Sequence, residues 1–295
     1  MANTFTTAGS DPNVGGVYPQ EYADSVQRRL NDITNWKDTC DWMLSNSNTL
    51  NFPYMSTEFT AQSGTRGTAY SFSDFTITND QVRLVNQDVV PVYVDYADLA
   101  QFSLLDWIRL GERMGEVVRE RVGSLVLAQH AAWTDFTNVS IGGAGTNITV
   151  SATNVDDIIR GVKREVGEAN GLELARERGM FIEWRFADME FLEQFAQANG
   201  FQLADAALKN GIANAYYFMG MYHYVSNRHT AGHLFGGVRK TFQLGLLRNT
   251  WGKLLESPPV NGDGPLSGVA KHYRIDYGFN APTAHATILF DINVA

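Results

Sequence analysis

The first part of the chain changes from a polar segment to a helical pattern of apolar side chains. Residues 1–18 are rich in Thr, Ser, Asn and Gly, which indicates an extended or loosely ordered arm. Pro19 is tolerated in a first helical turn, and apolar residues then recur at helical spacing, namely Tyr22, Val26, Leu30 and Ile33. The pattern predicts a helix that begins at Pro19 and reaches about Leu44.

Between residues 51 and 95 the apolar residues alternate with polar ones, as in strands. One run ends in Phe75 and Ile77, and a second extends from Val82 to Val94. The residues between them, Thr78, Asn79 and Asp80, are typical of a turn, so we expect a long β-hairpin. Because an isolated two-stranded ribbon is marginally stable in water, this hairpin is expected to need another surface to lie on.

A long helix is predicted from Asp98 to about Phe136. This stretch contains no proline, and its apolar stripe comprises Leu110, Met114, Val117, Val118, Val122, Leu125, Val126, Ala132 and Trp133. At 1.5 Å per residue it would span roughly 57 Å. A compact globule of this chain length has a diameter of only about 50 Å, so we expect a flat, elongated molecule with this helix as its spine.

Three glycines, Gly111, Gly115 and Gly123, lie inside the predicted helix. Each costs up to about 1 kcal/mol relative to alanine. They indicate either a kinked helix or a helix whose backbone is closely approached by a neighbouring segment.

The rest of the chain alternates between helical and strand patterns. Asn154 is expected to cap a helix that ends at Asn170-Gly171, and Asp188 a second one that ends at Asn199-Gly200. Strands are predicted at Met180–Phe186, at Gly220–Val225 and at Ala286–Val294. Together these elements predict the α+β class.

Composition and charge exclude several classes of protein. With 44% hydrophobic and 19% charged residues, the 295-residue chain is too apolar to be disordered. Its net charge of −9 argues against a dedicated nucleic-acid-binding role, which requires a basic surface. The first 16 residues do not resemble a signal peptide, and we expect no transmembrane helix and no membrane partner. The single cysteine, Cys40, cannot form an intrachain disulfide and is interpreted as a small apolar residue.

Four groups of residues were candidates for chemistry. Five histidines fall in the last third of the chain: His223, His229, His233, His272 and His285. His229 and His233 have the spacing of a helical metal pair, but the residues between them form helices poorly. The other groups are an acidic cluster (Glu183, Asp188, Glu190, Glu193), a glycine run (142–145) without phosphate-loop spacing, and a basic group (Arg239, Lys240, Arg248) beside Phe242. We predict no catalytic residue, no cofactor and no metal site.

The order of the predicted elements along the chain and the local sequence together resemble those of the major capsid proteins of tailed phages, which have the Hong Kong 97 fold. The stretches that carry the resemblance are Leu208–Gly211, the run from Met219 through Val225-Ser226-Asn227, and Tyr277–Pro282 with the strand after it. The resemblance implies an N-terminal arm (1–50), an extended hairpin called the E-loop (51–97) and a peripheral domain with the spine helix (98–153). It further implies an axial domain with returning peripheral strands (154–285) and a C-terminal strand (286–295).

The resemblance also implies a structural function and a set of partners. Copies of the chain would form pentamers and hexamers of an icosahedral shell around double-stranded DNA, which is packaged without sequence-specific binding. The protein would be made in the host cytoplasm and end in the virion capsid. A portal, a separate scaffolding protein and possibly a decoration protein are the further partners implied.

Within the hairpin, the sequence departs from some members of that family. No lysine lies between Gln62 and Asp98, so the isopeptide cross-link of those members is not expected. Arg66 and Arg83 are instead candidates for contacts with acidic groups of a neighbouring subunit. Three alternatives remain open: an encapsulin-type compartment with protein cargo, a metal-dependent hydrolase that uses the late histidines, and a tail or adhesion protein.

Overall fold

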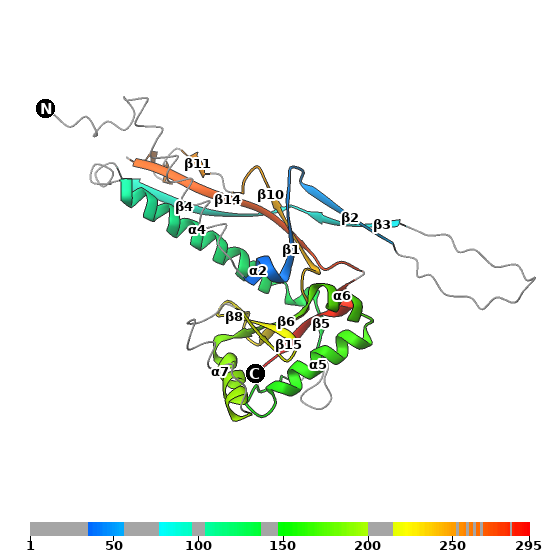
Figure 1. Cartoon of the computed structure of the whole chain (residues 1–295). Coiled ribbons are helices and arrows are strands. Elements are labelled where there is room, and N and C mark those ends of the chain that lie inside the picture. Colours follow the sequence, from blue (N-terminus) through cyan, green and yellow to red (C-terminus); the bar gives the residue numbers. More distant parts are fainter. Residues whose placement is uncertain are drawn as a thin grey trace, which may run out of the picture.

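The molecule has an elongated half and a rounded half, each built on its own β-sheet (Figure 1). This computed structural model describes residues 35–55, 77–95, 104–136, 147–199, 215–251, 254–257, 260–261, 264–265, 268–283 and 285–295. The predicted helix from Pro19, the Leu208–Gly211 motif and the glycine run 142–145 therefore lie partly or wholly outside the described residues. None of the described helices is long and apolar enough to cross a membrane.

The elongated half is organised around one long strand, β14 (Gly268–Asn280). On one side β14 pairs with β10 (Phe242–Leu247) and with β11 (Leu254–Ser257), and on the other with β4 (Asn86–Asp95), always antiparallel. The strand β1 (Cys40–Ser45) continues the sheet by pairing parallel to β10. A two-stranded ribbon of residues 260–261 and 264–265, β12 and β13, follows β11.

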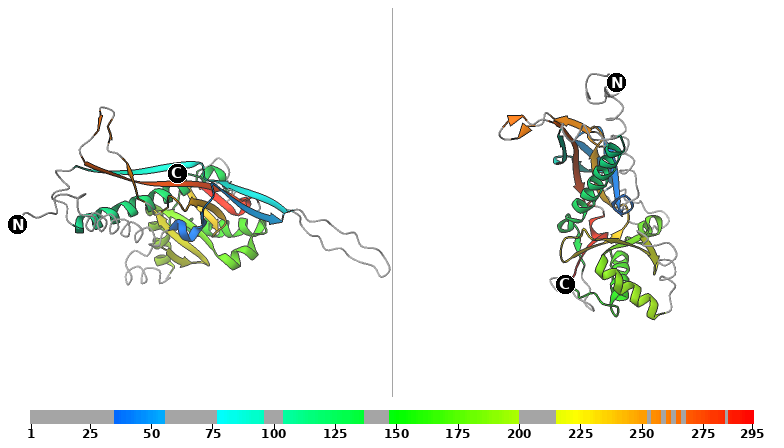
Figure 2. Two further views of the ribbon diagram at one scale, coloured as in Figure 1. Left: turned by 90° about the horizontal axis from the view of Figure 1, so that it is seen from above. Right: turned by 90° about the vertical axis from the view of Figure 1, so that its left-hand side faces the viewer.

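A hairpin leaves this sheet at one end. It is formed by β2 (Thr49–Met55) and β3 (Ile77–Arg83), which pair antiparallel over their whole length. The left view of Figure 2 shows both strands extending beyond the sheet. The end of β3 is followed within three residues by β4, so the hairpin strand and the sheet strand are almost continuous.

The long helix α4 (Leu104–Leu127) covers one face of the elongated sheet. Its buried residues, Met114, Val118, Val122 and Val126, form a core with Val94, Tyr273 and Ile275 of the sheet. The short helix α2 (Asn35–Thr39) packs against α4 and leads directly into β1. One face of the sheet is thus buried by a helix, as the period-two pattern of β4 requires.

The rounded half contains a six-stranded mixed sheet. Its order is β5 (Thr134–Asp135), β15 (Leu289–Asn293), β9 (His233–Val238), β6 (Met180–Arg185), β8 (Met221–Ser226) and β7 (Ala215–Phe218). Three helices accompany it: α5 (Val155–Glu168), α6 (Leu172–Arg178) and α7 (Phe186–Ala198). Two single 3-10 turns, His130–Ala132 and Ala286–Ile288, precede β5 and β15.

Both faces of the six-stranded sheet are buried, and successive residues of β6 show how. Phe181 packs into the core that includes α4, whereas Ile182 and Trp184 pack into a second core with α5 and α7. Since alternate residues of a strand point to opposite faces, one sheet joins the two cores. The helix-rich pattern of residues 154–199 and the strand predictions at 180–186 and 220–225 are confirmed within one or two residues.

The predicted hairpin turn is wrong. Thr78, Asn79 and Asp80 lie inside β3, where they pair with residues of β2, and the second expected strand splits into the end of β3 and β4. The pairing of β4 with β14 and the hydrogen bonds that Asp80 accepts from Thr283 override the local turn preference.

Three helix predictions also need correction. The segment Cys40–Ser45, expected to be the end of a helix, is strand β1, because it pairs with β10 over six residues. Helix α4 ends at Leu127 instead of about Phe136, because Trp133 turns inward to stack on Phe235 at 3.7 Å between ring centroids. The described helix of 24 residues spans about 36 Å, not 57 Å.

The two predicted helix caps differ in detail. Asn154 occupies the N-cap position of α5, but its side-chain oxygen accepts a hydrogen bond from the backbone N–H of Ser151, which precedes the helix. Asp188 does not cap α7; it lies in the first turn and its carboxylate pairs with Arg185 at 2.5 Å. A carboxylate in the first turn still stabilises the helix, because its negative charge interacts favourably with the positive end of the helix dipole.

Candidate assembly surface

The base of the hairpin crosses the elongated sheet at two glycines that face each other. Gly245 of β10 is the cross-strand partner of Gly278 of β14. A methyl group at Gly245 would lie 2.6 Å from Leu84 Cδ2 and 2.8 Å from Leu50 Cδ1. A methyl group at Gly278 would overlap the backbone carbonyl oxygen of Arg83. The absence of side chains at this pair lets the hairpin backbone rest directly on the sheet.

Polar contacts hold the hairpin base in the same place. The Asp80 carboxylate accepts hydrogen bonds from the backbone N–H of Thr283 at 3.0 Å and from its hydroxyl at 3.3 Å. The N–H of Leu84 donates to the carbonyl of Asn48 at 2.8 Å, which closes the base between the two strands. Val82 and Leu84 are buried there, so the attachment is both apolar and hydrogen-bonded.

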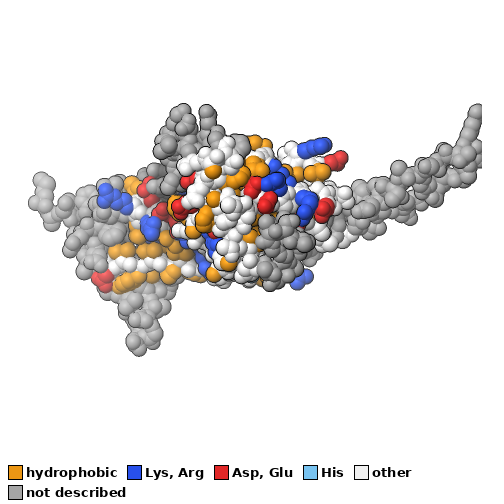
Figure 3. Space-filling model, turned by 90° about the horizontal axis from the view of Figure 1, so that it is seen from below, with side chains coloured by type: hydrophobic (Ala, Val, Ile, Leu, Met, Phe, Trp, Pro, Cys, Tyr) orange, Lys and Arg blue, Asp and Glu red, His pale blue; other side chains and the backbone are white. Residues whose placement is uncertain are grey.

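The other face of the elongated sheet exposes apolar side chains. Val90, Val92 and Val94 of β4 face the helix-covered core. The alternate residues, Val89 and Tyr93, are 45% and 43% exposed, and Val85 just before the strand is 76% exposed. Seen from below, hydrophobic side chains form bands on the elongated half with a few charged ones beside them, whereas hydrophobic and charged side chains are mixed over the rounded half (Figure 3). These side chains make this face of β4 a candidate for contact with another protein, which would remove their apolar area from water.

Strand β4 is also an edge strand. Among the described residues it pairs with β14 alone, and Pro91 lies in the middle of its ten residues. A proline inside a sheet is tolerated on an edge strand, where its missing N–H does not break the ladder.

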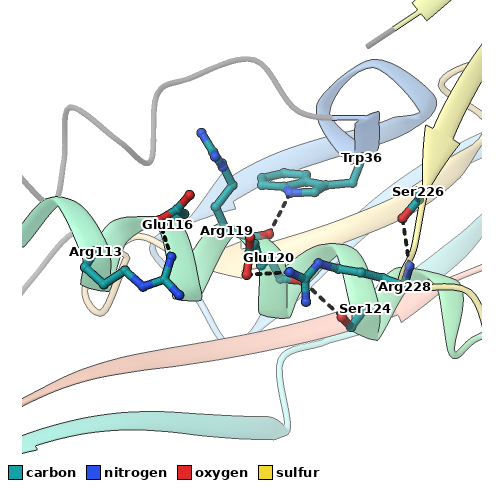
Figure 4. Close-up of polar contacts among 8 residues, drawn as sticks. All are labelled: Trp36, Arg113, Glu116, Arg119, Glu120, Ser124, Ser226 and Arg228. Carbon is teal, nitrogen blue, oxygen red and sulfur yellow. Dashed lines mark hydrogen bonds and ion pairs between the residues drawn. The ribbon is translucent and has the colours of Figure 1, made fainter. Parts of the chain in front are cut away.

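The long helix α4 is attached to the segment before β1 through Trp36 (Figure 4). The indole N–H of Trp36 donates to the carbonyl of Arg119 at 3.2 Å. The Cδ1 atom of its ring lies 3.5 Å from where a Cβ at Gly123 would be, an ordinary van der Waals distance. Trp36 is buried and makes edge-to-face contacts with Trp42 and Trp251. Trp36 thus packs on the helix at Gly123, but a Cβ would fit there, so this contact does not by itself require a glycine.

An ion pair joins the same helix to the rounded half. Arg228, which follows β8, reaches Glu120 of α4 with 2.5 Å between Nη2 and Oε2 (Figure 4). Both side chains are about one-third exposed, at 36% and 35%. Water screens such a pair, so its contribution is below about 1 kcal/mol.

Glu183 of β6 is a buried carboxyl group next to the α2 segment. Burial raises its pKa to about 7, and a hydrogen bond from the Asn35 amide, at 3.1 Å, partly offsets this effect. The same amide donates to the carbonyl of Val225 at 2.8 Å. Desolvation also raises the pKa of the Cys40 thiol, which keeps it protonated and unreactive.

Two of the late histidines are held neutral by burial. The Nδ1 of His223 accepts a hydrogen bond from the Trp184 indole at 3.0 Å, so its Nε2 carries the hydrogen and donates to the Phe218 carbonyl, also at 3.0 Å. Burial lowers the pKa of His223 to about 4 and that of His229 to about 4. His223 is therefore a fully hydrogen-bonded core residue.

The residues singled out in the sequence do not come together as one site. Arg83 is exposed on β3, and Arg66 lies outside the described residues. His229 and His233 do not share a helix, since His233 begins strand β9. In the acidic cluster, Glu183 binds Asn35, whereas Asp188 binds Arg185.

The basic group is likewise dispersed into structural contacts. Arg239 stacks on the ring of Tyr222, with 4.4 Å from its guanidinium carbon to the ring centroid, and lies 3.6 Å from Asp38. Lys240 has a positive φ of 54° and its carbonyl accepts a hydrogen bond from Arg178 at 2.5 Å. These contacts give the basic residues a role inside the fold.

Sequence reasoning missed the glycine pair under the hairpin. Gly245 and Gly278 each interrupt an apolar strand, and a glycine inside a strand is the signal for a close backbone approach. Sequence alone, however, does not reveal that the two face each other.

No family model and no curated protein matches the chain in sequence. Several solved structures share its fold. A virus-like particle from Pyrococcus furiosus aligns with a TM-score of 0.60 at 11% identity, covering 94% of this chain and 99% of that one. The mature capsid of bacteriophage PhiM1 aligns with a TM-score of 0.57 at 12% identity, covering 90% and 88%. The chain has a phage capsid fold. A structure from Mycobacterium phage Che8 supports the same fold, with a TM-score of 0.58, 13% identity and coverage of 83% and 84%.

Proposed function

We propose that this chain is the major capsid protein of a tailed phage, a shell-building subunit without a catalytic role. The observation that carries the proposal is the likeness to capsid subunits over almost the full length of both chains. A likeness of that extent leaves little of the chain for a separate catalytic domain. The buried state of Cys40 and His223 agrees with a structural role.

The elements of the capsid fold can be given roles on this basis. The β2–β3 hairpin with residues 56–76 corresponds to the E-loop, and α4 to the spine helix of a peripheral domain. Residues 1–50 would form the N-terminal arm, 51–97 the E-loop region, 98–153 the peripheral domain and 154–285 the axial domain with returning peripheral strands. Residues 286–295 would be the C-terminal strand.

In the proposed assembly, one surface of each copy contacts a different surface of the next copy. A head-to-tail contact that closes by rotation produces rings such as pentamers and hexamers. The hairpin projects from the sheet at one end, and the exposed apolar face of β4 lies along the same half. In the proposed shell, a hairpin gains its supporting surface from an adjacent copy, because a lone ribbon is marginally stable.

The proposal includes partners and a location. Double-stranded DNA would be enclosed without sequence-specific binding, which suits a net charge of −9. A portal, a separate scaffolding protein and possibly a decoration protein would complete the particle. The subunit would be made in the host cytoplasm and end in the virion capsid.

The test is to express the chain with its genetic neighbours and examine the purified material by negative-stain electron microscopy. Closed icosahedral shells with five-fold and six-fold units are expected. Tubes or fibres would instead indicate a tail or adhesion protein, and a permanently monomeric globule would overturn the shell proposal.

An encapsulin-type shell with a protein cargo is the second candidate. The observation that favours it is the high coverage, 94% and 99%, of the alignment with the virus-like particle. The contents of purified particles separate the two candidates. DNA and a portal support the phage capsid, whereas a co-purifying enzyme inside the shell supports the compartment.

A further inference from the structure

Two histidines and an aspartate from three distant parts of the chain meet beside the six-stranded sheet. His130 lies in the 3-10 turn after α4, His233 begins β9, and Asp291 lies in the middle of β15. The Nδ1 atom of His233 is 2.9 Å from Asp291 Oδ2, and the Nδ1 atom of His130 is 3.5 Å from the same oxygen. One ligand atom from each residue lies within 4.8 Å of the others.

The aspartate in this cluster is buried in a setting that disfavours a bare negative charge. Asp291 is only 3% exposed, and desolvation raises its pKa. The charges that act on it are those of His233 and His130, which lower its pKa if protonated, and of Asp135, which raises it. Asp135 is the partner of Asp291 in the parallel pairing of β5 with β15. A buried carboxylate between two imidazoles and near a second carboxylate favours the binding of a cation.

We infer that His130, His233 and Asp291 form a binding site for a divalent transition-metal ion of the zinc class. Imidazole nitrogen and carboxylate oxygen are the ligands that Zn²⁺ takes alongside cysteine. With bonds of about 2.0–2.1 Å, tetrahedral ligand atoms lie roughly 3.3 Å apart, and the observed 2.9 and 3.5 Å bracket that spacing.

The imidazole rings of His130 and His233 must change their orientation slightly for the ion to bind. The two imidazoles are stacked, with 3.7 Å between centroids and 20° between planes. The hydrogen that His233 Nδ1 shares with the Asp291 carboxylate must be released to solvent when the ion binds. The rings must also tilt apart so that both Nδ1 lone pairs converge on one point. Because the two side chains are 24% and 26% exposed, a water molecule can fill the fourth position and the ion can enter from solvent.

The three ligands come from elements that belong to different parts of the fold. His130 follows the long helix of the elongated half, whereas His233 and Asp291 lie on neighbouring strands of the rounded half. A bound ion would therefore fasten the end of α4 to the six-stranded sheet. This set differs from the His229–His233 pair suggested by sequence spacing.

The test uses the full-length chain, stripped with a chelator and titrated with Zn²⁺ by calorimetry at pH 7.5. One equivalent per chain is expected, together with a rise in the thermal midpoint on adding Zn²⁺. The visible spectrum of a Co²⁺-loaded sample should be that of a tetrahedral site.

Variants localise the ion. His130→Ala and His233→Ala each should weaken Zn²⁺ binding at least tenfold, and Asp291→Asn should do the same without changing the shape of the side chain. His285→Ala, a half-buried histidine outside the cluster, is the control and should bind as the parent does. His130 lies in a surface turn, so its variant reports on binding even if Asp291→Asn folds poorly.

Two results would overturn the inference. One is a parent chain that takes up no Zn²⁺ above the His130→Ala variant. The other is a cluster that responds to protons alone, so that the thermal midpoint shifts with pH equally in the presence and absence of Zn²⁺.

Discussion

Single residues without side chains decide how the hairpin is attached. At Gly245 and Gly278 the neighbouring backbone and the side chains of Leu50, Val82 and Leu84 occupy the space that a Cβ would need. Packing of this kind tolerates no added atom, because protein interiors are close-packed. The contact is consequently more sensitive to a methyl group than to the loss of a surface charge.

Gly278→Ala should destabilise the chain by about 1–3 kcal/mol, because the methyl group overlaps the Arg83 carbonyl and the hairpin base must shift. Urea unfolding measures the change. Gly167→Ala is the matched control: it lies in α5, its Cβ would be 3.8 Å from Leu172, and helix propensity predicts a gain of up to about 1 kcal/mol. Equal stability of Gly278→Ala and the parent would contradict the close approach.

Glu183 makes stability depend on pH. Its pKa is about 7 in the folded chain against an ordinary value of 4.5, so the folded state holds the proton more tightly than the unfolded state. Stability should then fall as pH rises from about 4.5 to about 7, by roughly 3 kcal/mol in total. The buried histidines His223 and His229 act in the opposite direction, because their folded pKa values are lowered to about 4.

Glu183→Gln isolates the carboxyl group from these histidines. The difference in unfolding free energy between Glu183→Gln and the parent should shift in favour of the variant as pH rises through this window, and stay constant above it. Denaturant unfolding at several pH values measures it, with Glu190→Gln on the exposed face of α7 as the control. A difference that does not change with pH would show that the carboxyl group is not buried as described.

At the scale of elements, the joint between α2 and α4 fastens the start of β1 to the long helix. Trp36 supplies a hydrogen bond to Arg119, a flat surface against Gly123 and ring contacts with two further tryptophans. A large aromatic side chain with so many partners contributes more to stability than the exposed ion pair between Glu120 and Arg228.

Trp36→Ala should cost about 3–5 kcal/mol, the range for removing a buried aromatic side chain. Trp36→Phe keeps most of the apolar contact and loses the hydrogen bond to Arg119, so its cost should be clearly smaller. Both are measured by denaturant unfolding. If the two substitutions cost the same, the packing against Gly123 would not be the main contribution.

Elements with strong local patterns could be predicted from sequence, and elements defined by pairing could not. Helix α5 has a clear apolar face and ends at Glu168, two residues before Asn170, whose positive φ of 57° turns the chain away as the sequence indicates. Strand β1 and the interior of β3 have sequences typical of a helix end and of a turn, and long-range pairing with β10 and β2 decides their structure. The length of α4 was overestimated because nothing local marks its end near Leu127.

The candidate sites show the same division. Arg83 was predicted to be available on the hairpin and is exposed on β3, and its contact with a neighbour stays a prediction. The cluster of His130, His233 and Asp291 could not be predicted, because its members are far apart in sequence and no spacing rule relates them.

At the scale of the whole molecule, the proposed shell depends on contacts repeated in every copy. Because an exposed ion pair contributes below about 1 kcal/mol, its effect in one subunit is small. In a closed ring every copy makes the same contact with the copy on each side, so one substitution weakens every interface of the ring by the same amount.

Arg66 and Arg83 are each expected to form an ion pair with an acidic group of a neighbouring subunit. If the two ion pairs together contribute about 1 kcal/mol, replacing both arginines by alanine should raise the protein concentration needed for shell assembly roughly fivefold. Light scattering at graded concentrations measures this, and circular dichroism should show an unchanged fold. Arg176→Ala, an exposed arginine on α6, serves as the control. Unchanged assembly of the double variant would remove both arginines from the proposed contact.

Pro91 in the middle of β4 affects whether unassembled chains at high concentration can pair through the edges of their sheets. A free strand edge is a template on which another chain can add, and stacking of that kind leads to fibres. A proline interrupts the row of N–H donors along the strand, so an added strand cannot form backbone hydrogen bonds with all ten residues of β4. Freshly synthesised chains should therefore meet through side chains on the sheet face, and open-ended polymerisation along this edge is disfavoured.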